Sequence, residues 1–169
     1  MGAAGRSPVT TRLAQLGLTL PPVPAPVAAY VPAVRTGRYV YTSGQLPLVD
    51  GALTVTGRVG DEVDPATATA AARTAALNAL AAVASVADGL DAVVRVVRVV
   101  GYVASAPGFT GQPAVVNGAS ELVGQVFGAA GEHARSAVGV SALPLGAPVE
   151  IELLVEVGTT QRDAGDERP

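Results

Sequence analysis

The sequence predicts an α+β fold in which a mixed sheet of about six strands carries two helices on one face. Three observations lead to this fold class. Asp64-Pro65 is a typical helix start and opens a segment with apolar residues at helical spacing. Residues 93–103 form a valine-dense strand between that helix and a second helical segment. Residues 149–157 alternate between apolar residues and glutamates, as a half-buried strand does.

The part of the chain before the first helix is predicted to form strands. Residues 31–35 and 39–43 flank Thr36-Gly37, which is typical of a hairpin turn. A short third strand is expected at residues 53–56. The predicted order of elements along the chain is therefore β-β-(β)-α-β-α-β-β.

The two predicted helices each carry an apolar stripe. The first helix begins at Asp64-Pro65 and ends at Asp88-Gly89. Its stripe consists of Leu77, Leu80, Ala84 and Ala87, with Asn78 placed elsewhere on the helix. The stripe of the second helix consists of Val115, Ala119, Leu122 and Val126. Because residues 93–103 show no clean alternation, that strand is expected to be buried on both faces.

The last two strands, at residues 135–142 and 149–157, hold the most informative polar residues. If the valines of both strands face the core, Arg135 and Glu150 extend from the same side of the sheet. Ser43 joins that side if Val40 faces the helices. An arginine flanked by alanine and glycine leaves room for a small anion. The same spacing also fits a structural cross-strand ion pair, and spacing alone slightly favours that alternative.

Composition limits the possible functions. The chain has 169 residues, enough for one domain, and 49% hydrophobic against 15% charged residues predicts a large apolar area buried between subunits. A net charge of −3 makes nucleic acid an unlikely partner. The absence of cysteine excludes thiolate catalysis and zinc–thiolate sites. Arg95 and Arg98 interrupt the valine run, so no membrane span is expected, and without a signal peptide a cytoplasmic location is expected.

Short motifs spread along the chain carry a resemblance to a known family. They are Tyr30-Val31-Pro32-Ala33-Val34, Tyr41-Thr42-Ser43-Gly44-Gln45-Leu46-Pro47, Val115-Val116-Asn117, and Arg135-Ser136 with Leu143-Pro144 and Val149-Glu150-Ile151-Glu152. In order and spacing they resemble the RidA (YjgF/YER057c/UK114) family, in its longer RidA-like subgroup. Accordingly, residues 1–24 are expected to be a partly disordered extension, residues 25–157 the RidA-like domain, and residues 158–169 a disordered tail.

The resemblance implies a fold, an assembly and an activity. The fold would be chorismate-mutase-like, and the protein would be a homotrimer with sites between its subunits. The activity would be that of a deaminase, which hydrolyses 2-aminoacrylate-like enamines and 2-imino acids to 2-keto acids and ammonia without a cofactor or metal. Arg135 would hold the substrate carboxylate and Glu150 would handle the water. Tyr30, Ser43 and, by its position, Asn117 would help to bind the substrate.

Some residues depart from the family pattern and leave other functions open. Ala137 stands where many relatives have cysteine, and Gly139 replaces a larger residue, which changes the expected pocket. The alternatives are an endoribonuclease of the same family and a non-catalytic module that binds a small carboxylate. His133 is expected to be an exposed loop residue. Asp61, Glu62 and Asp64 are expected to complement the dipole of the first helix rather than to bind metal.

Overall fold

The computed structural model describes residues 8–23 and 29–158. Of the two chain ends predicted to be partly or wholly disordered, residues 1–7 and 159–169 lie outside the described residues. The main sheet has five strands in the order β1-β2-β7-β5-β6, with β5 and β6 parallel and the other pairs antiparallel. Its strands are β1 (Ala33–Thr36), β2 (Tyr39–Thr42), β5 (Val93–Ala104), β6 (Ala134–Val140) and β7 (Val149–Val157).

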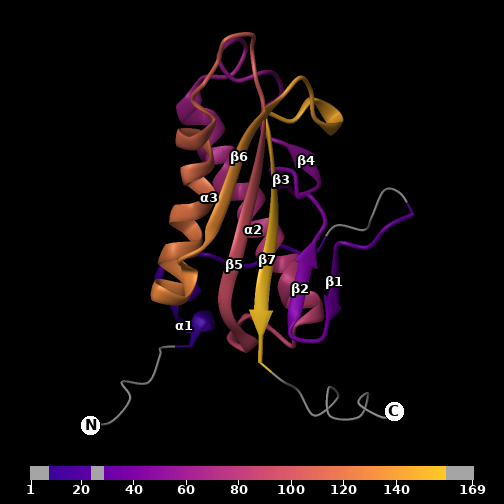
Figure 1. Ribbon diagram of the computed structural model, residues 1–169, viewed down its shortest axis with the longest axis vertical. Coiled ribbons are helices and arrows are strands. Elements are labelled where there is room, and N and C mark those ends of the chain that lie inside the picture. Colours follow the sequence, from indigo (N-terminus) through magenta and orange to yellow (C-terminus); the bar gives the residue numbers. More distant parts are fainter. Residues whose placement is uncertain (1–7, 24–28, 159–169) are drawn as a thin grey trace.

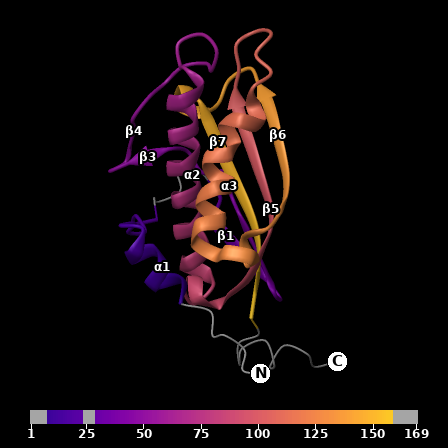
Figure 2. The ribbon, with the colours of Figure 1, turned by 90° about the vertical axis from the view of Figure 1, so that its left-hand side faces the viewer.

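Two long helices, α2 (Pro65–Val86) and α3 (Gln112–Phe127), lie side by side on one face of this sheet (Figures 1 and 2). The predicted α+β class with a mixed sheet and two helices on one face is therefore confirmed. The third predicted strand does not join the main sheet. It pairs as β4 (Ala52–Leu53) with β3 (Leu48–Val49) in a separate two-stranded ribbon.

The start of α2 follows directly from Asp64 and Pro65. The Asp64 carboxylate accepts hydrogen bonds from the backbone N–H groups of Ala66 and Thr67, at 3.0 Å each, and Pro65 occupies the first helical position. By length and composition alone α2 is apolar enough to cross a membrane, but 56% of that apolar window is buried inside the fold. Its apolar character is therefore that of a core helix.

Alanines form most of the buried surface of α2, which is wider than the predicted stripe. The buried residues include Ala68, Ala71, Ala72, Ala75, Ala76, Ala79, Leu80 and Val83, whereas Leu77 and Ala84 are only partly buried. Small side chains let α2 and α3 approach closely. At Gly118 of α3, an added Cβ would lie 2.0 Å from the backbone oxygen of Thr69 on α2.

Asn78 has a structural role that the helical pattern missed. It was expected away from the apolar stripe, yet its side chain is buried, and Nδ2 donates to the carbonyl oxygens of Leu46 (2.8 Å) and Leu48 (3.0 Å). A buried amide needs such partners. These two bonds fasten the segment after β2 to the middle of α2.

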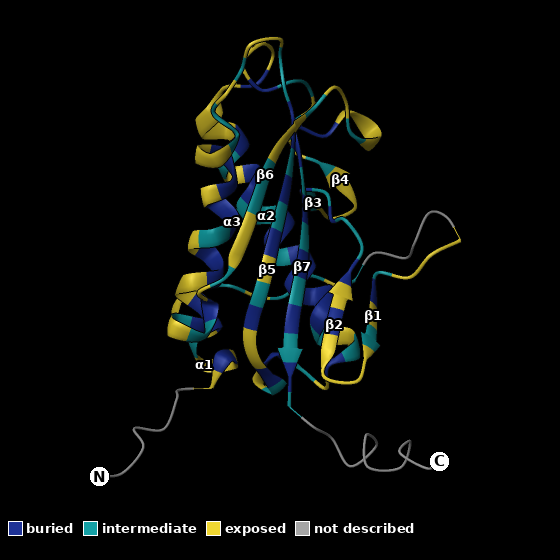
Figure 3. Ribbon diagram, viewed as in Figure 1, coloured by how far each residue is buried: buried dark blue, intermediate teal, exposed yellow. Residues whose placement is uncertain are grey.

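The face of the sheet opposite the helices is uncovered in a single chain. On β5, Val96, Val99 and Val103 are buried beneath the helices, while Val94 is 40% exposed and Arg98 is exposed. The expected burial of β5 on both faces is therefore wrong for one copy of the chain. Figure 3 shows the exposed and half-buried residues along the strands of this open face.

The N-terminal residues before the sheet form a short helix, α1 (Val9–Gln15), within the predicted extension. Val9 and Leu13 are buried, and the Thr10 hydroxyl donates to the Asp91 carboxylate at 3.0 Å. Asp91 belongs to the 3-10 turn η1 (Leu90–Ala92), and two further 3-10 turns are η2 (Gly128–Gly131) and η3 (Pro144–Gly146). The helix α1 thus packs on the body of the fold.

Candidate active site

Arg135 lies on β6, at the edge of the sheet beside α3. It pairs across the sheet with the buried Val99, so its side chain lies on the helix side. There Nη1 donates to Asn117 Oδ1 at 2.7 Å and to Ser120 Oγ at 3.3 Å. The guanidinium is exposed and has no carboxylate within ion-pair distance among the described residues. It is thus an oriented cation with capacity for an anion.

Glu150 lies on β7 and pairs with Tyr102 of β5, so its side chain is on the open face. Its carboxylate rests against Gly44, where an added Cβ would lie 1.7 Å from Oε1. Burial raises the pKa of Glu150, and repulsion from Glu152 raises it further. A carboxylate with a raised pKa suits proton transfer near neutral pH.

Arg135 and Glu150 therefore lie on opposite faces of the sheet, and the prediction that they share a face is wrong. The valines of β6 do not face the core. Val138 pairs with Tyr102 on the open face, whereas Ala137 and Gly139 face α3. An added Cβ at Gly139 would lie 2.7 Å from Gln112 Nε2, at the first residue of α3. A structural ion pair between Arg135 and Glu150 of one chain is excluded by the same geometry.

Ser43 lies in the neighbourhood of Glu150, whereas no contact of the described residues places Tyr30 beside that carboxylate. Ser43 directly precedes Gly44, and its hydroxyl donates to the Val31 carbonyl oxygen at 2.7 Å. Tyr30, the residue before Val31, is 48% exposed. The paired backbone bonds between Gln45 and Ile151, at 2.8 and 3.0 Å, hold this segment beside β7. The structure thus separates the predicted residues into one group with Glu150 and another with Arg135 and Asn117.

Ser120 and His133 extend the Arg135 group, and the sequence reading did not assign them to it. His133 is half-buried, so the expectation that it is exposed is wrong. Both of its ring nitrogens have hydrogen-bond partners. Nε2 lies 2.9 Å from Ser120 Oγ, and Nδ1 lies 2.5 Å from the Gly131 carbonyl oxygen. The spacing of Asn117 and Ser120, three residues apart on one helix, was a signal that both share a face.

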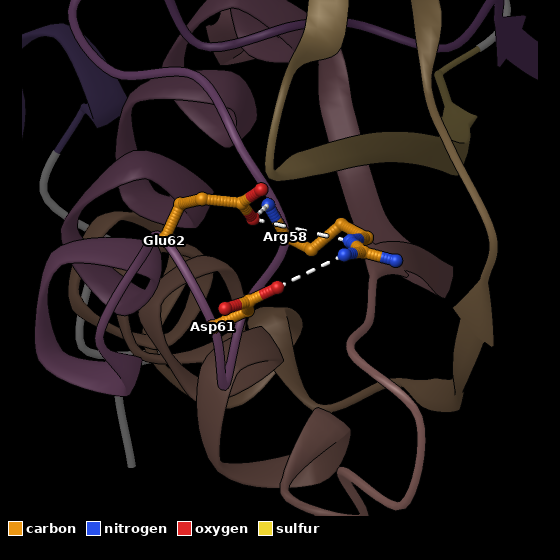
Figure 4. A network of polar contacts seen from close by, with 3 residues as sticks. All are labelled: Arg58, Asp61 and Glu62. Carbon is orange, nitrogen blue, oxygen red and sulfur yellow. Dashed lines mark hydrogen bonds and ion pairs between the residues drawn. The ribbon is translucent and has the colours of Figure 1, made fainter.

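A second polar cluster lies in the loop before α2, away from both groups. Arg58 Nη2 donates to Asp61 Oδ2 at 2.9 Å, and the Arg58 backbone N–H donates to Glu62 Oε2 at 2.8 Å (Figure 4). Asp61 and Glu62 therefore pair with Arg58, and Asp64 alone of the three acidic residues caps the helix. Within residues 8–23 and 29–158, no group of three or more histidine, aspartate or glutamate side chains could hold a metal ion.

Two shallow hollows of the single chain contain neither Arg135 nor Glu150. One, of about 130 Å³, lies on the open face and is lined by Tyr41, Thr42, Arg98, Val100, Glu152, Leu153 and Leu154. The other, of about 160 Å³, is lined by Gly57, Arg58, Glu62, Ala104, Ser141, Ala142, Leu143, Gly146 and Ala147. Neither hollow joins the guanidinium to the carboxylate.

Several known proteins are similar to this chain. Protein TCP17 of Trypanosoma cruzi is 44% identical over 156 residues, which cover 92% of this chain and 96% of TCP17. The crystal structure of Atu1372 from Agrobacterium tumefaciens, a protein of unknown function, is 45% identical, has a TM-score of 0.83 and covers 89% of this chain and 92% of its own. A Shewanella oneidensis protein proposed to be an endoribonuclease is 30% identical, with a TM-score of 0.86 and coverage of 89% and 100%.

The same similarity extends over most of the described fold. The YjgF gene product of E. coli is 26% identical, with a TM-score of 0.58, and covers 79% of this chain and 92% of its own. The family model named Endoribonuclease L-PSP matches residues 22–157, which include both groups of candidate site residues. The chain therefore belongs to the Endoribonuclease L-PSP family, the YjgF/RidA family that its sequence motifs resemble.

Proposed function

We propose that this protein hydrolyses small 2-imino acids and their enamine tautomers to 2-keto acids and ammonia. The active site would form between two copies of the chain. One copy would supply Arg135 and Asn117, and the other would supply Glu150, Ser43 and Tyr30. One observation carries this proposal. The exposed guanidinium of Arg135, which has no ion pair within the described part of the chain, and the Glu150 carboxylate, whose pKa is raised, extend from opposite faces of one sheet.

The chemistry assigns a separate task to each group. Arg135 would bind the substrate carboxylate through two parallel hydrogen bonds, with Asn117 holding the guanidinium in place. After the enamine tautomerises to the imine, water attacks the C=N carbon. Glu150 would take a proton from that water and deliver it to the nitrogen, which gives a carbinolamine. It would then move the proton of the new hydroxyl to the amine, which leaves as ammonia while the carbonyl forms. The reaction consumes one water and needs no cofactor.

A homotrimer would bring the two groups together. The open face of the sheet presents Tyr39, Tyr41 and Val138, which are 44%, 49% and 45% exposed, and no helix of the same chain covers them. Apolar side chains in such an arrangement are typical of a surface buried by other copies. The homotrimer and the cytoplasmic location both remain proposals.

The experiment is to generate 2-imino acids with an amino-acid oxidase and to measure their hydrolysis. Arg135→Ala and Glu150→Gln should each abolish turnover, and Arg135→Lys should rescue little because lysine lacks the planar two-point grip. Arg73→Ala is the matched control, since Arg73 of α2 donates to Gln125 of α3 and belongs to neither group of candidate site residues. Turnover like that of the wild type in Arg135→Ala would refute the proposal.

Mixing two inactive variants tests whether the site is shared. If Arg135→Ala and Glu150→Gln chains assemble randomly in equal amounts, about one quarter of the sites contain both intact residues. The mixture should then recover about that fraction of wild-type turnover after the subunits are unfolded and refolded together. No recovery at all would refute a site shared between two copies.

The family name favours endoribonuclease activity as a second candidate. The acidic chain weighs against it, because phosphate contacts need clustered basic residues. Highly purified protein should therefore not cleave RNA at physiological salt. Salt-resistant cleavage that disappears in Arg135→Ala would favour the ribonuclease, and binding of 2-keto acids without turnover would favour a non-catalytic carboxylate-binding module.

A further inference from the structure

A chain of hydrogen bonds runs from Arg135 through Ser120 to His133. Arg135 Nη1 donates to Ser120 Oγ at 3.3 Å, and Ser120 Oγ lies 2.9 Å from His133 Nε2. His133 Nδ1 lies 2.5 Å from the Gly131 carbonyl oxygen. The three side chains come from β6, α3 and the turn before β6, so independent elements of the fold hold them together.

The partners fix which atom donates in each bond. A carbonyl oxygen only accepts, so His133 Nδ1 must carry a proton. In neutral His133, Nε2 therefore has a free lone pair, and the Ser120 hydroxyl donates to it. Ser120 Oγ then accepts a hydrogen bond from Arg135, and its hydroxyl group uses its only proton to donate a hydrogen bond to His133. In this state Ser120 has no proton left for a ligand.

Protonation of His133 reverses the bond between the two residues. Nε2–H then donates to Ser120 Oγ, which already accepts from Arg135. The Ser120 hydroxyl proton is then no longer engaged by His133 and can point away from the two donors, His133 and Arg135. Because Ser120 is half-buried and Arg135 is exposed, the released donor lies beside the guanidinium at the surface.

We propose that Ser120 is a carboxylate-binding residue whose donor proton His133 turns toward the ligand when the imidazole is protonated. This inference rests on the proposed function only in taking a small carboxylate as the ligand of Arg135. A ligand carboxylate would then accept from Arg135 and from Ser120. Binding should be tighter in solution acidic enough to protonate the imidazole.

Other charged groups around His133 must be separated from this effect. Glu132 precedes His133 in the same turn, Glu121 follows Ser120 on α3, and Arg95 of β5 donates to the Glu132 carbonyl oxygen at 3.4 Å. None of these carboxylates lies within ion-pair distance of His133 in the described chain. Glu150 also titrates with a raised pKa, so the measurements are made in the Glu150→Gln background.

The first measurement uses the fact that His133 is the only histidine of the chain. Nitrogen-15 NMR of the labelled imidazole therefore reports a single ring. At about pH 8 we expect Nδ1 to carry the proton and Nε2 to be bare. A proton on Nε2 at that pH would overturn the proposal, because Ser120 could not then donate to the ring.

The second measurement is the affinity for 2-oxobutyrate, by calorimetry at about pH 5.5 and about pH 8. The Glu150→Gln protein should bind about tenfold more tightly at the lower pH, as expected for one added hydrogen bond to a charged group. Adding Ser120→Ala or His133→Asn should reduce this ratio to less than about twofold. Asparagine can still donate to Gly131 while offering nothing at the Nε2 position. Glu132→Gln is the control and should retain the full ratio.

The outcomes separate this proposal from the proposed function. Equal affinity at the two pH values, or an unchanged ratio in Ser120→Ala, would overturn only the role of Ser120 and His133. Either result would mean that the Ser120 hydroxyl, once freed from His133, donates to a backbone carbonyl oxygen of α3 instead of to the ligand. No binding at either pH would overturn both proposals. The expected pH-dependent binding together with wild-type protein that does not hydrolyse imines would support the switch and refute the deaminase.

Discussion

The Glu150 carboxylate occupies the space that a side chain at position 44 would need. An added Cβ at Gly44 would lie 1.7 Å from Glu150 Oε1, which is the free end of a side chain and can move aside. Gly44→Ala should therefore leave the fold intact but displace the carboxylate.

The first prediction is that Gly44→Ala lowers imine turnover at least about tenfold, with a melting temperature close to that of the wild type. Turnover and thermal unfolding are measured for the wild type and for Gly44→Ala. A fall in turnover matched by a large fall in melting temperature would show that the substitution acts through the fold and not through the Glu150 carboxylate.

The second prediction concerns pH. Burial and then Glu152 raise the pKa of Glu150, so the base should become protonated, and turnover should fall, at a higher pH than for an ordinary carboxylate. Glu152→Gln removes the second cause and should shift this acidic limb to lower pH. The pH profile of kcat/KM for the two proteins checks the shift.

Protonation of Glu150 does not by itself destabilise the fold where this acidic limb lies. Because the folded pKa of Glu150 lies above its unfolded value, the folded state holds the proton more tightly than the unfolded chain. The contribution of Glu150 to stability is therefore largest at low pH and decreases as pH rises through its folded pKa. Thermal unfolding across the same pH range should show no loss of stability assignable to Glu150 where turnover falls.

The third prediction concerns the contact between the helices. Gly118→Ala would place a Cβ 2.0 Å from the Thr69 backbone oxygen, and backbone atoms cannot move aside cheaply. It should destabilise the protein by about 1–3 kcal/mol. Gly124→Ala, on the same helix with nothing within 4 Å, should stabilise it by about 0.5–1 kcal/mol. Denaturant unfolding of both variants gives the comparison, and equal effects would contradict the close crossing.

The fourth prediction concerns assembly. Val138→Asp places a charge on the open face of the sheet, where burial by another copy would desolvate it. The variant should fold but lose the trimer mass that light scattering is expected to give for the wild type. Val49→Asp, at a residue of similar exposure on β3, should assemble normally. A monomeric wild-type protein, or a trimeric Val138→Asp variant, would count against the proposed assembly.

The sequence predicted the elements well because local signals mark them. Asp64-Pro65 begins α2, and the alternation after Val149 places five buried residues beneath the helices. The face of β6 could not be predicted, since it depends on the position of α3. Valine is normally a core residue, but in β6 Ala137 and Gly139 lie on the face toward α3 and Val138 lies on the open face.

The site was predicted only in part, because some of its contacts also depend on how the elements pack together. Arg135 and Asn117 are brought together, and Ser43 lies in the neighbourhood of Glu150, as the motifs suggested. The roles of Ser120 and His133 depend on contacts between α3 and the turn before β6. Such contacts join residues that no local pattern connects, and His133 alone in a polar turn gives no periodic signal.

The buried alanines of α2 have a consequence for the thermodynamics of folding. An alanine side chain has no rotamers to lose, so burying Ala68, Ala72, Ala75, Ala76 and Ala79 costs almost no side-chain conformational entropy. For the same reason these alanines cannot change rotamer to make room for a larger neighbouring side chain. Changes in ligand preference during evolution should therefore arise in the loops and at the sheet edge. The buried alanines cannot change rotamer, so the interior cannot easily adjust to a change in the shape of the site.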